Sequence, residues 1–486
     1  MMKRILSVIL AVCMLGSLAV VVASAEEQPE KTYKYVALGD SIAAGYGLYD
    51  GDLGKDPALV LSEELIANPV QDAYAQVFGR YLAELGAEYG VATTATNLST
   101  TAYRAQDVAK TITTPGFKGE VATSILEGFV GPGTSEVLVP YHDIFNNYLP
   151  EADMISIQLG ANDIIMGIIV PINSYDNPIL KDVGLAVTLL LFGLEPEQAI
   201  GYGIQQIMND KDKITKDHIV EATKVFADII KNRDQYVLNA AEQVEGVVEA
   251  VEGVNPTADI ALVGMFNPYG NSLVYDGQVR DICHVVQNIF VRCVSEALDC
   301  EVTVDEEPDT ITFDEPQDVA EELDNVADEI SNTPMTDCFK AKLQSLVTIV
   351  AEEIAYPVQY FTAGKAADPQ MKLLNEKVQD IALRHGATYV NVYDITNECN
   401  TDPHPDAQHH KEIADRLGAA MTDKIVSRMN PEFEPELNIE SATLIQQYIA
   451  EFDIKHIDFK AADFNGDGKV DINDVTAMQR VLAELV

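Results

Sequence analysis

Short apolar runs alternate with longer segments of helical periodicity along most of the chain. Runs rich in β-branched, aromatic or other apolar residues predict buried strands at 33–38, 91–98, 154–159, 260–266 and 388–392. Apolar residues spaced three and four apart predict helices at 73–85, 219–251, 370–385 and 411–429. Because strands and helices alternate, we expect a parallel sheet with helices on both faces.

Other segments interrupt this alternation. Residues 49–69 form a polar segment with glycine and proline, which predicts a loop, and residues 271–366 predict a long insertion with an acidic stretch. Two markedly apolar segments, 164–170 and 183–194, follow the third predicted strand. One interpretation is a buried helical hairpin, and the alternative is an apolar wall or lid that receives an acyl chain.

The first residues have the pattern of a secretory signal. A basic start precedes an apolar core at 5–22, and Ala23-Ser24-Ala25 matches a cleavage site between small residues. We therefore expect a signal peptide at 1–25 and a secreted, extracellular protein with no integral membrane span after cleavage. An uncleaved anchor is the alternative, because the apolar run approaches the length of a spanning helix.

Composition narrows the function classes further. The 486 residues suggest two or three domains, and the formal net charge of −45 disfavours binding to nucleic acid or anionic membranes. Five cysteines follow the predicted signal peptide, an odd number that requires at least one free thiol or intermolecular bond. The pairing stays open, because a reducing habitat would leave all five as thiols: Cys283, Cys293, Cys300, Cys338 and Cys399.

Candidate chemistry begins at the end of the first predicted strand, where the chain reads Gly39-Asp40-Ser41. A serine at a strand-to-helix junction lies beside free backbone N–H groups, which suits a nucleophile whose reaction builds negative charge nearby. The alternative is that Asp40 or Ser41 only caps a helix, since both residue types are favoured caps. The motif alone does not decide between these interpretations.

Three further segments follow in order: Asn97 to Ala102, Gly160-Ala161-Asn162-Asp163, and Asp402-Pro403-His404-Pro405. With Gly39-Asp40-Ser41 they resemble the four blocks of the SGNH hydrolases, also called the GDSL esterase/lipase family, over roughly residues 33 to 425. The resemblance implies a flavodoxin-like three-layer α/β/α sandwich with a parallel sheet and helical insertions. It also implies a Ser41 nucleophile, a His404 general base, and oxyanion donors from the backbone of Ser41 and Ala102 and the side chain of Asn162.

The chain departs from the family pattern at two places. Ala102 stands where most members have glycine, so its N–H could still serve unless the site requires a positive φ. Asp402 lies two residues before His404, whereas the family usually has aspartate three residues before. We expect Asp402 to orient the imidazole, and the alternative is a Ser–His dyad oriented by a backbone carbonyl. We interpret His409 and His410 as residues of a helix start.

The C-terminal end contains a second kind of site. Residues 463–474 place oxygen ligands at calcium-loop spacing, with Gly468 at the sixth position. The pattern predicts structural calcium and a following helix at 475–485. The predicted metal residues are Asp463, Asn465, Asp467, Lys469, Asp471 and Asp474.

An internal repeat extends this pattern. Residues 437–452 align with 470–485, and isoleucine, threonine, glutamine, alanine and glutamate recur at equivalent positions. A duplicated loop–helix unit resembles a type I dockerin, which implies a small all-α domain at 429–486, a cohesin partner and a cellulosome scaffold. In the first loop Pro435 replaces the required glycine, so we expect one well-formed calcium site.

The combined hypothesis is a secreted serine esterase. Residues 26–428 would form the catalytic domain, would need no cofactor for catalysis, and would hydrolyse acyl esters on plant polysaccharides. The apolar segments favour an alternative, a lipase or lysophospholipase acting on longer acyl chains. A second alternative, from a different class, is a catalytically silent adhesion or assembly module that keeps the fold.

Overall fold

The computed structural model describes residues 31–48, 63–117, 141–191, 213–266, 364–395, 404–430 and 469–483, with runs of one to three residues between these ranges. Several predictions fall outside the described residues. They include the signal peptide at 1–25, the orienting acid Asp402, any pairing of the cysteines, and the calcium residues Asp463, Asn465 and Asp467.

The centre of the fold is a parallel sheet in the order β2-β1-β3-β4-β5. The predicted α/β fold is confirmed, and the strand order is that of flavodoxin-like proteins. Each strand lies within or overlaps one of the five predicted runs. Their bounds are β1 Thr32–Gly39, β2 Ala92–Asn97, β3 Met154–Gln158, β4 Asp259–Val263 and β5 Thr388–Val390.

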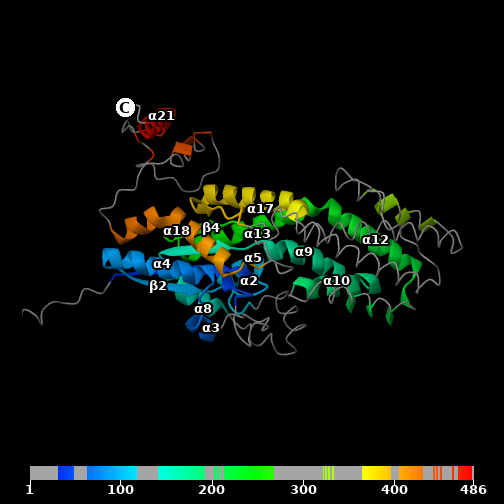
Figure 1. Cartoon of the computed structure of the whole chain (residues 1–486). Helices are drawn as coiled ribbons and strands as arrows, with labels where there is room; N and C mark the ends of the chain where they lie inside the picture. Colours follow the sequence, from blue (N-terminus) through cyan, green and yellow to red (C-terminus); the bar gives the residue numbers. More distant parts are fainter. Residues whose placement is uncertain are drawn as a thin grey trace, which may run out of the picture.

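Helices cover the sheet in two groups (Figure 1). One group is α4 (Tyr74–Tyr89) with α18 (Ala407–Met429), which pack against each other and against the strands. The other group packs around α13 (Arg233–Val254) and includes α5 (Ala105–Thr113) and α17 (Gly364–His385). These contacts give the predicted three layers.

The main core lies between these layers. In β1, Tyr35 and Leu38 are almost completely buried, and the Tyr35 ring meets the ring of Phe78 in α4 edge-on, with centroids 4.8 Å apart. Burial of one such side chain is worth about 1.5–3 kcal/mol. The strand that ends at the candidate nucleophile is therefore held rigidly in the core.

The prediction of a single helix at 219–251 is wrong. The structure has two helices there, α12 (Lys216–Lys231) and α13, and Asn232 separates them. Asn232 leaves the helical conformation with ψ of 11°, yet its N–H still bonds to Asp228 and its carbonyl accepts from Tyr236. Apolar periodicity continues across such a break, so hydrophobic pattern alone did not reveal it.

The prediction of a loop at 49–69 is also partly wrong. It contains a short helix, α3 (Glu63–Ala67), none of whose residues is buried. Two more helices were not anticipated, α5 and α8 (Tyr141–Tyr148). Both have fewer than the roughly 11 residues over which an apolar period is read along a sequence.

The described parts of the two apolar segments form the helical hairpin expected in one interpretation, and residues 192–194 lie outside the described residues. The hairpin consists of α9 (Ala161–Ser174) and α10 (Pro178–Leu191), which pack against each other. Asn177 caps α10 through its side-chain oxygen, and its amide donates to the carbonyl of His218 in α12 at 2.7 Å. Among the described helices, none combines the length and the apolar character that a membrane crossing needs.

The C-terminal part has a small core of its own. Ala442 and Ile445 pack with Val475 and Met478. These are equivalent positions of the predicted repeat, so the two repeat units bury the same face against each other. The helix α21 (Ile472–Leu482) begins three residues before the predicted start at 475, because Asp471 caps it by accepting the N–H of Asn473.

Candidate active site

The candidate site lies where the strand order reverses. β1 pairs with β2 on one side and with β3 on the other, so the carboxyl ends of β1 and β3 flank the switch point of the sheet. Ser41 follows β1 after one residue, and Asn162 follows β3 after three. In open α/β sheets this crevice is the usual place for a ligand.

The local structure leaves Ser41 available for chemistry. Asp40 caps the short helix α2 (Ser41–Ala44) by accepting the N–H of Ile42 at 3.0 Å, so Ser41 is not the cap. Burial raises the pKa of Asp40 to about 6, and the hydrogen bond from Ile42 opposes this rise. Gly39 is required by close packing, since a Cβ there would lie 2.4 Å from the Cβ of Ala43.

Ser41 and His404 meet although 363 positions separate them. The Nε2 atom of His404 lies 2.9 Å from Oγ of Ser41. When the serine hydroxyl donates, Nε2 accepts and the ring proton lies on Nδ1. His404 precedes α18, whose start is fixed by Asp406, which accepts the N–H of His409 at 2.9 Å. The histidine that faces Ser41 is thus anchored by a capped helix.

Ala102 adopts a left-handed backbone with φ of 64°, and no other residue except glycine has a positive φ within the described ranges. This conformation costs a residue with a Cβ about 1–2 kcal/mol. The turn before it rests on the end of β1, because Thr100 N–H bonds to the Gly39 carbonyl at 3.3 Å. Asn97 adds a bond from its amide to the Ala43 carbonyl at 2.7 Å.

Asn162 is tied to the same turn. Its amide nitrogen donates to the carbonyl of Tyr103 at 3.0 Å, the residue after Ala102. An amide nitrogen carries two hydrogens, and this bond uses one. Because Asn162 and Ala102 are linked through Tyr103, two of the predicted oxyanion donors are held in one local network.

Asp163 has a structural role that the sequence did not reveal. Its carboxylate accepts the N–H groups of Ala105 at 2.7 Å and Gln106 at 3.4 Å, and thereby caps α5 from another element. Burial raises the pKa of Asp163 to about 7, while the two backbone bonds and the charge of Arg104 oppose the rise. Asn162 and Asp163 together fix residues 103 to 106, which follow Ala102 immediately.

Two further contacts at the site also escaped the sequence analysis. The ring of Tyr46 lies against the imidazole of His404, with centroids 4.5 Å apart and planes inclined at 48°. His410 is buried, and its Nδ1 accepts the N–H of Tyr74 at 3.1 Å at the start of α4. Burial lowers the pKa of His410 to about 3, so the imidazole is neutral. The prediction that His409 and His410 belong to a helix start agrees with their place in α18.

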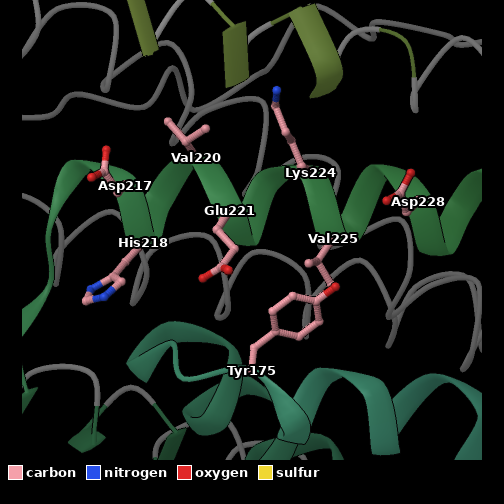
Figure 2. A pocket seen from close by; sticks show the side chains of 8 residues that line it. All are labelled: Tyr175, Asp217, His218, Val220, Glu221, Lys224, Val225 and Asp228. Carbon is pink, nitrogen blue, oxygen red and sulfur yellow. The ribbon is translucent and has the colours of Figure 1, made fainter.

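A separate hollow of about 460 Å³ lies beside α12 (Figure 2). It is lined mainly by polar side chains of α12, with Tyr175 facing them from the end of α9. Neither Ser41 nor His404 lines this hollow, so we do not associate it with the candidate chemistry.

Three predicted calcium residues are described and three are not. Asp463, Asn465 and Asp467 lie outside the described residues. Lys469 precedes α21, and the carboxylates of Asp471 and Asp474 stand at its start, where Asp474 accepts the N–H of Asp471 at 2.8 Å. Hard oxygen donors of this kind fit calcium, so the described part of the loop is compatible with the predicted ion.

The comparison with protein families finds one match, to the dockerin type I domain at residues 441–483. The predicted resemblance of the C-terminal part to dockerins is confirmed. The match covers a small part of the chain and does not describe residues before 441. No curated protein is similar enough to the whole chain to count as a match.

Three solved structures illustrate what resembles the rest of the chain. An extracellular lipase from Streptomyces rimosus is 11% identical, and phospholipase A1 from Streptomyces albidoflavus NA297 is 12% identical, each with a TM-score of 0.32 over 80% of this chain and 99% of its own. The lipase Lip_vut3 from a goat rumen metagenome is 10% identical, with a TM-score of 0.29 over 80% and 97%. TM-scores of this size carry no argument, so the α/β assignment rests on the sheet itself. The comparisons show a family only for residues 441–483, which match the dockerin type I domain.

Proposed function

We propose that the chain is a secreted serine esterase that hydrolyses carboxylic esters. The observation that carries this proposal is the 2.9 Å contact between Ser41 Oγ and His404 Nε2 at the switch point of the sheet. A hydroxyl and an imidazole at this distance form the nucleophile–base pair that acyl transfer requires. The same contact argues against the alternative of a catalytically silent module.

In the first step Ser41 Oγ attacks the ester carbonyl carbon while its proton passes to His404 Nε2. The carbonyl π electrons move to oxygen, and that oxyanion accepts from the N–H groups of Ser41 and Ala102 and from the second amide hydrogen of Asn162. Collapse breaks the carbon–oxygen bond of the ester. The departing alkoxide takes the proton from His404, which leaves an acyl-serine.

Water completes the cycle. It attacks the acyl-serine while His404 takes one of its protons, and the second tetrahedral intermediate collapses to release the acid and restore the Ser41 hydroxyl. Asp402 would orient His404 through Nδ1. A backbone carbonyl in that place remains the alternative, since both would fix the same tautomer.

The substrate we favour is an acyl group on a plant polysaccharide, because a dockerin type I domain at residues 441–483 would attach the enzyme to a cellulosome scaffold. The test is the rate of hydrolysis along a chain-length series of p-nitrophenyl esters, measured beside acetate release from acetylated xylan. Ser41→Ala serves as the matched inactive control. A preference for acetyl esters supports the proposal, and activity confined to long chains contradicts this substrate class.

A lipase or lysophospholipase is the second candidate. Its support is the apolar hairpin α9–α10, which begins beside Asn162 and exposes Val170 and Leu185 by 40% and 37%. In this candidate the exposed side chains of the hairpin would contact a long acyl chain. The same ester series distinguishes this candidate, because rates would rise with chain length.

The C-terminal domain would attach the enzyme to a scaffold. We infer a signal peptide at 1–25, a catalytic domain at 26–428 and a dockerin-like domain at 429–486 that binds a cohesin outside the cell. Bound calcium would be held by side-chain oxygens of Asp463, Asn465, Asp467, Asp471 and Asp474 and by the segment at Lys469. The ion would neutralise carboxylates that otherwise repel one another.

A further inference from the structure

The element that carries this inference is the turn after the candidate nucleophile. Tyr46 stands between Gly45 and Gly47, both left-handed with φ of 84° and 83°. The Tyr46 N–H bonds to the Ser41 carbonyl at 3.0 Å, which closes the turn on the nucleophile's own backbone. A Cβ at Gly45 would lie 2.8 Å from the Cβ of Ala73, so the turn packs closely against the residue before α4.

The turn directs the Tyr46 ring onto His404. Their ring centroids are 4.5 Å apart, within the roughly 6 Å over which an aromatic face attracts a cation. Two side chains thus contact the imidazole of His404: the Ser41 hydroxyl at Nε2, and the aromatic ring of Tyr46. The Tyr46 side chain is half-buried, which limits the solvent that would screen the attraction.

We propose that Tyr46 is a positioning residue that holds the His404 ring and stabilises its protonated form. This inference rests on the proposed function, in which His404 becomes an imidazolium when it takes the Ser41 proton. Charge that appears only in the transition state is stabilised selectively by an aromatic face already in place. The phenol hydroxyl plays no part in this effect, so phenylalanine should replace tyrosine.

Within the described residues, two other titratable groups lie near this imidazole, and in the proposed mechanism Asp402 would orient it as well. Asp40 lies at the end of β1, where the charge of His404 opposes the rise that burial causes in the Asp40 pKa, while His410 in α18 is neutral because burial lowers its pKa to about 3. Neither is altered by a change at residue 46. A difference between Tyr46 variants in the titration of His404 therefore reports the ring contact.

The experiment is an NMR titration of the His404 imidazole in the full chain, assigned with His404→Gln, for wild type, Tyr46→Phe and Tyr46→Leu. Loss of the aromatic face makes protonation harder, so the midpoint in Tyr46→Leu should fall by roughly half a pH unit. Tyr46→Phe should match wild type. Tyr89→Leu changes a tyrosine that is 38% exposed at the end of α4 and is the matched control.

Hydrolysis of a soluble ester gives the second readout. Tyr46→Leu should lower kcat roughly three- to tenfold with little change in KM, and Tyr46→Phe should restore the rate. The titration needs no substrate, so it decides the inference even if no ester is turned over, whereas inactivity of wild type would contradict the proposed function alone. An unchanged midpoint in Tyr46→Leu, or an equal fall in Tyr46→Phe, overturns the inference.

Discussion

Ser41 Oγ and His404 Nε2 lie 2.9 Å apart, although the two residues are 363 positions apart in the sequence. Ser41 follows the buried strand β1, and His404 precedes the capped helix α18. The contact therefore joins the end of a core strand to the segment that leads into a capped helix. The predictions below test what this arrangement implies.

The first prediction concerns Asn162. Asn162→Ala should lower kcat about 100- to 1,000-fold with a smaller change in KM, because the amide would donate mainly to the transition state. Steady-state kinetics on a soluble ester measure both constants. Asn146→Ala, in α8, removes an amide that bonds within its own helix and is the control. A rise in KM without a fall in kcat would mean that Asn162 binds substrate.

The left-handed backbone at Ala102 gives a prediction about stability. Ala102→Gly should raise the free energy of unfolding by about 1 kcal/mol, because glycine adopts φ of 64° without the clash of a Cβ. Activity should be kept, since the N–H remains. Ala109→Gly, inside the helix α5, should instead lose about 1 kcal/mol. Chemical denaturation of the three proteins compares them, and destabilisation by Ala102→Gly would refute strain at this turn.

Asp163 makes stability depend on pH. Its pKa is raised to about 7 in the folded protein and is near 3.9 in an unfolded chain. Between these values the folded state binds more protons, so this group lowers stability as pH rises from about 4 to 7. In Asp163→Asn this loss is absent. The stability of the variant relative to wild type should therefore increase over that range.

Denaturation midpoints measured at pH 4, 5, 6 and 7 test this prediction for Asp163. Asp40, with a pKa raised to about 6, contributes a loss of the same sign in both proteins and cancels in the comparison. A difference between variant and wild type that stays constant with pH would show that Asp163 titrates at an ordinary pKa.

Much of this arrangement was predictable from local pattern. Ser41 and Asn162 each follow a buried apolar run, and parallel strands bring such ends to one edge of a sheet. Asp163 and Tyr46 were missed because their contacts join elements far apart: Asp163 reaches residues 58 and 57 positions away, and Tyr46 meets a histidine of the last segment. No local signal distinguishes these two side chains from an ordinary helix residue and an ordinary turn residue.

Backbone conformation was the other feature that the sequence could not predict. Alanine at position 102 left open whether the backbone there has a positive φ, and the structure shows that it does, with φ of 64°. The break at Asn232 was invisible for a related reason, since α12 and α13 continue one apolar period across it. Side-chain pattern reports which face is buried, and it does not report where the main chain departs from the helix.

The C-terminal domain leads to a prediction about calcium. Chelation should abolish binding to a cognate cohesin and leave hydrolysis of a small ester nearly unchanged, because the carboxylates of the 463–474 loop repel one another without a cation. Asp467→Ala should behave like chelated wild type. Calorimetric titration with a cohesin, with and without calcium, measures binding. Parallel loss of ester hydrolysis would place a calcium site in the catalytic domain instead.

The proposed orienting acid gives another prediction. Asp402→Asn should weaken ester hydrolysis less than His404→Ala does, because Asp402 would act only through the imidazole of His404, whereas His404 itself takes the proton. Rates on one soluble ester, compared at saturating substrate, measure the two losses. Equal losses would make Asp402 a full member of a triad.

The central claim is that Ser41 is a nucleophile activated by His404, and covalent labelling tests it most directly. A fluorophosphonate that reacts with activated serines should form one adduct, located by peptide mass spectrometry at Ser41. Ser41→Ala should remain unlabelled, and His404→Ala should react at least about 100-fold more slowly, since that is the usual contribution of a general base. An adduct on another serine, or equal labelling rates in wild type and His404→Ala, would contradict the account.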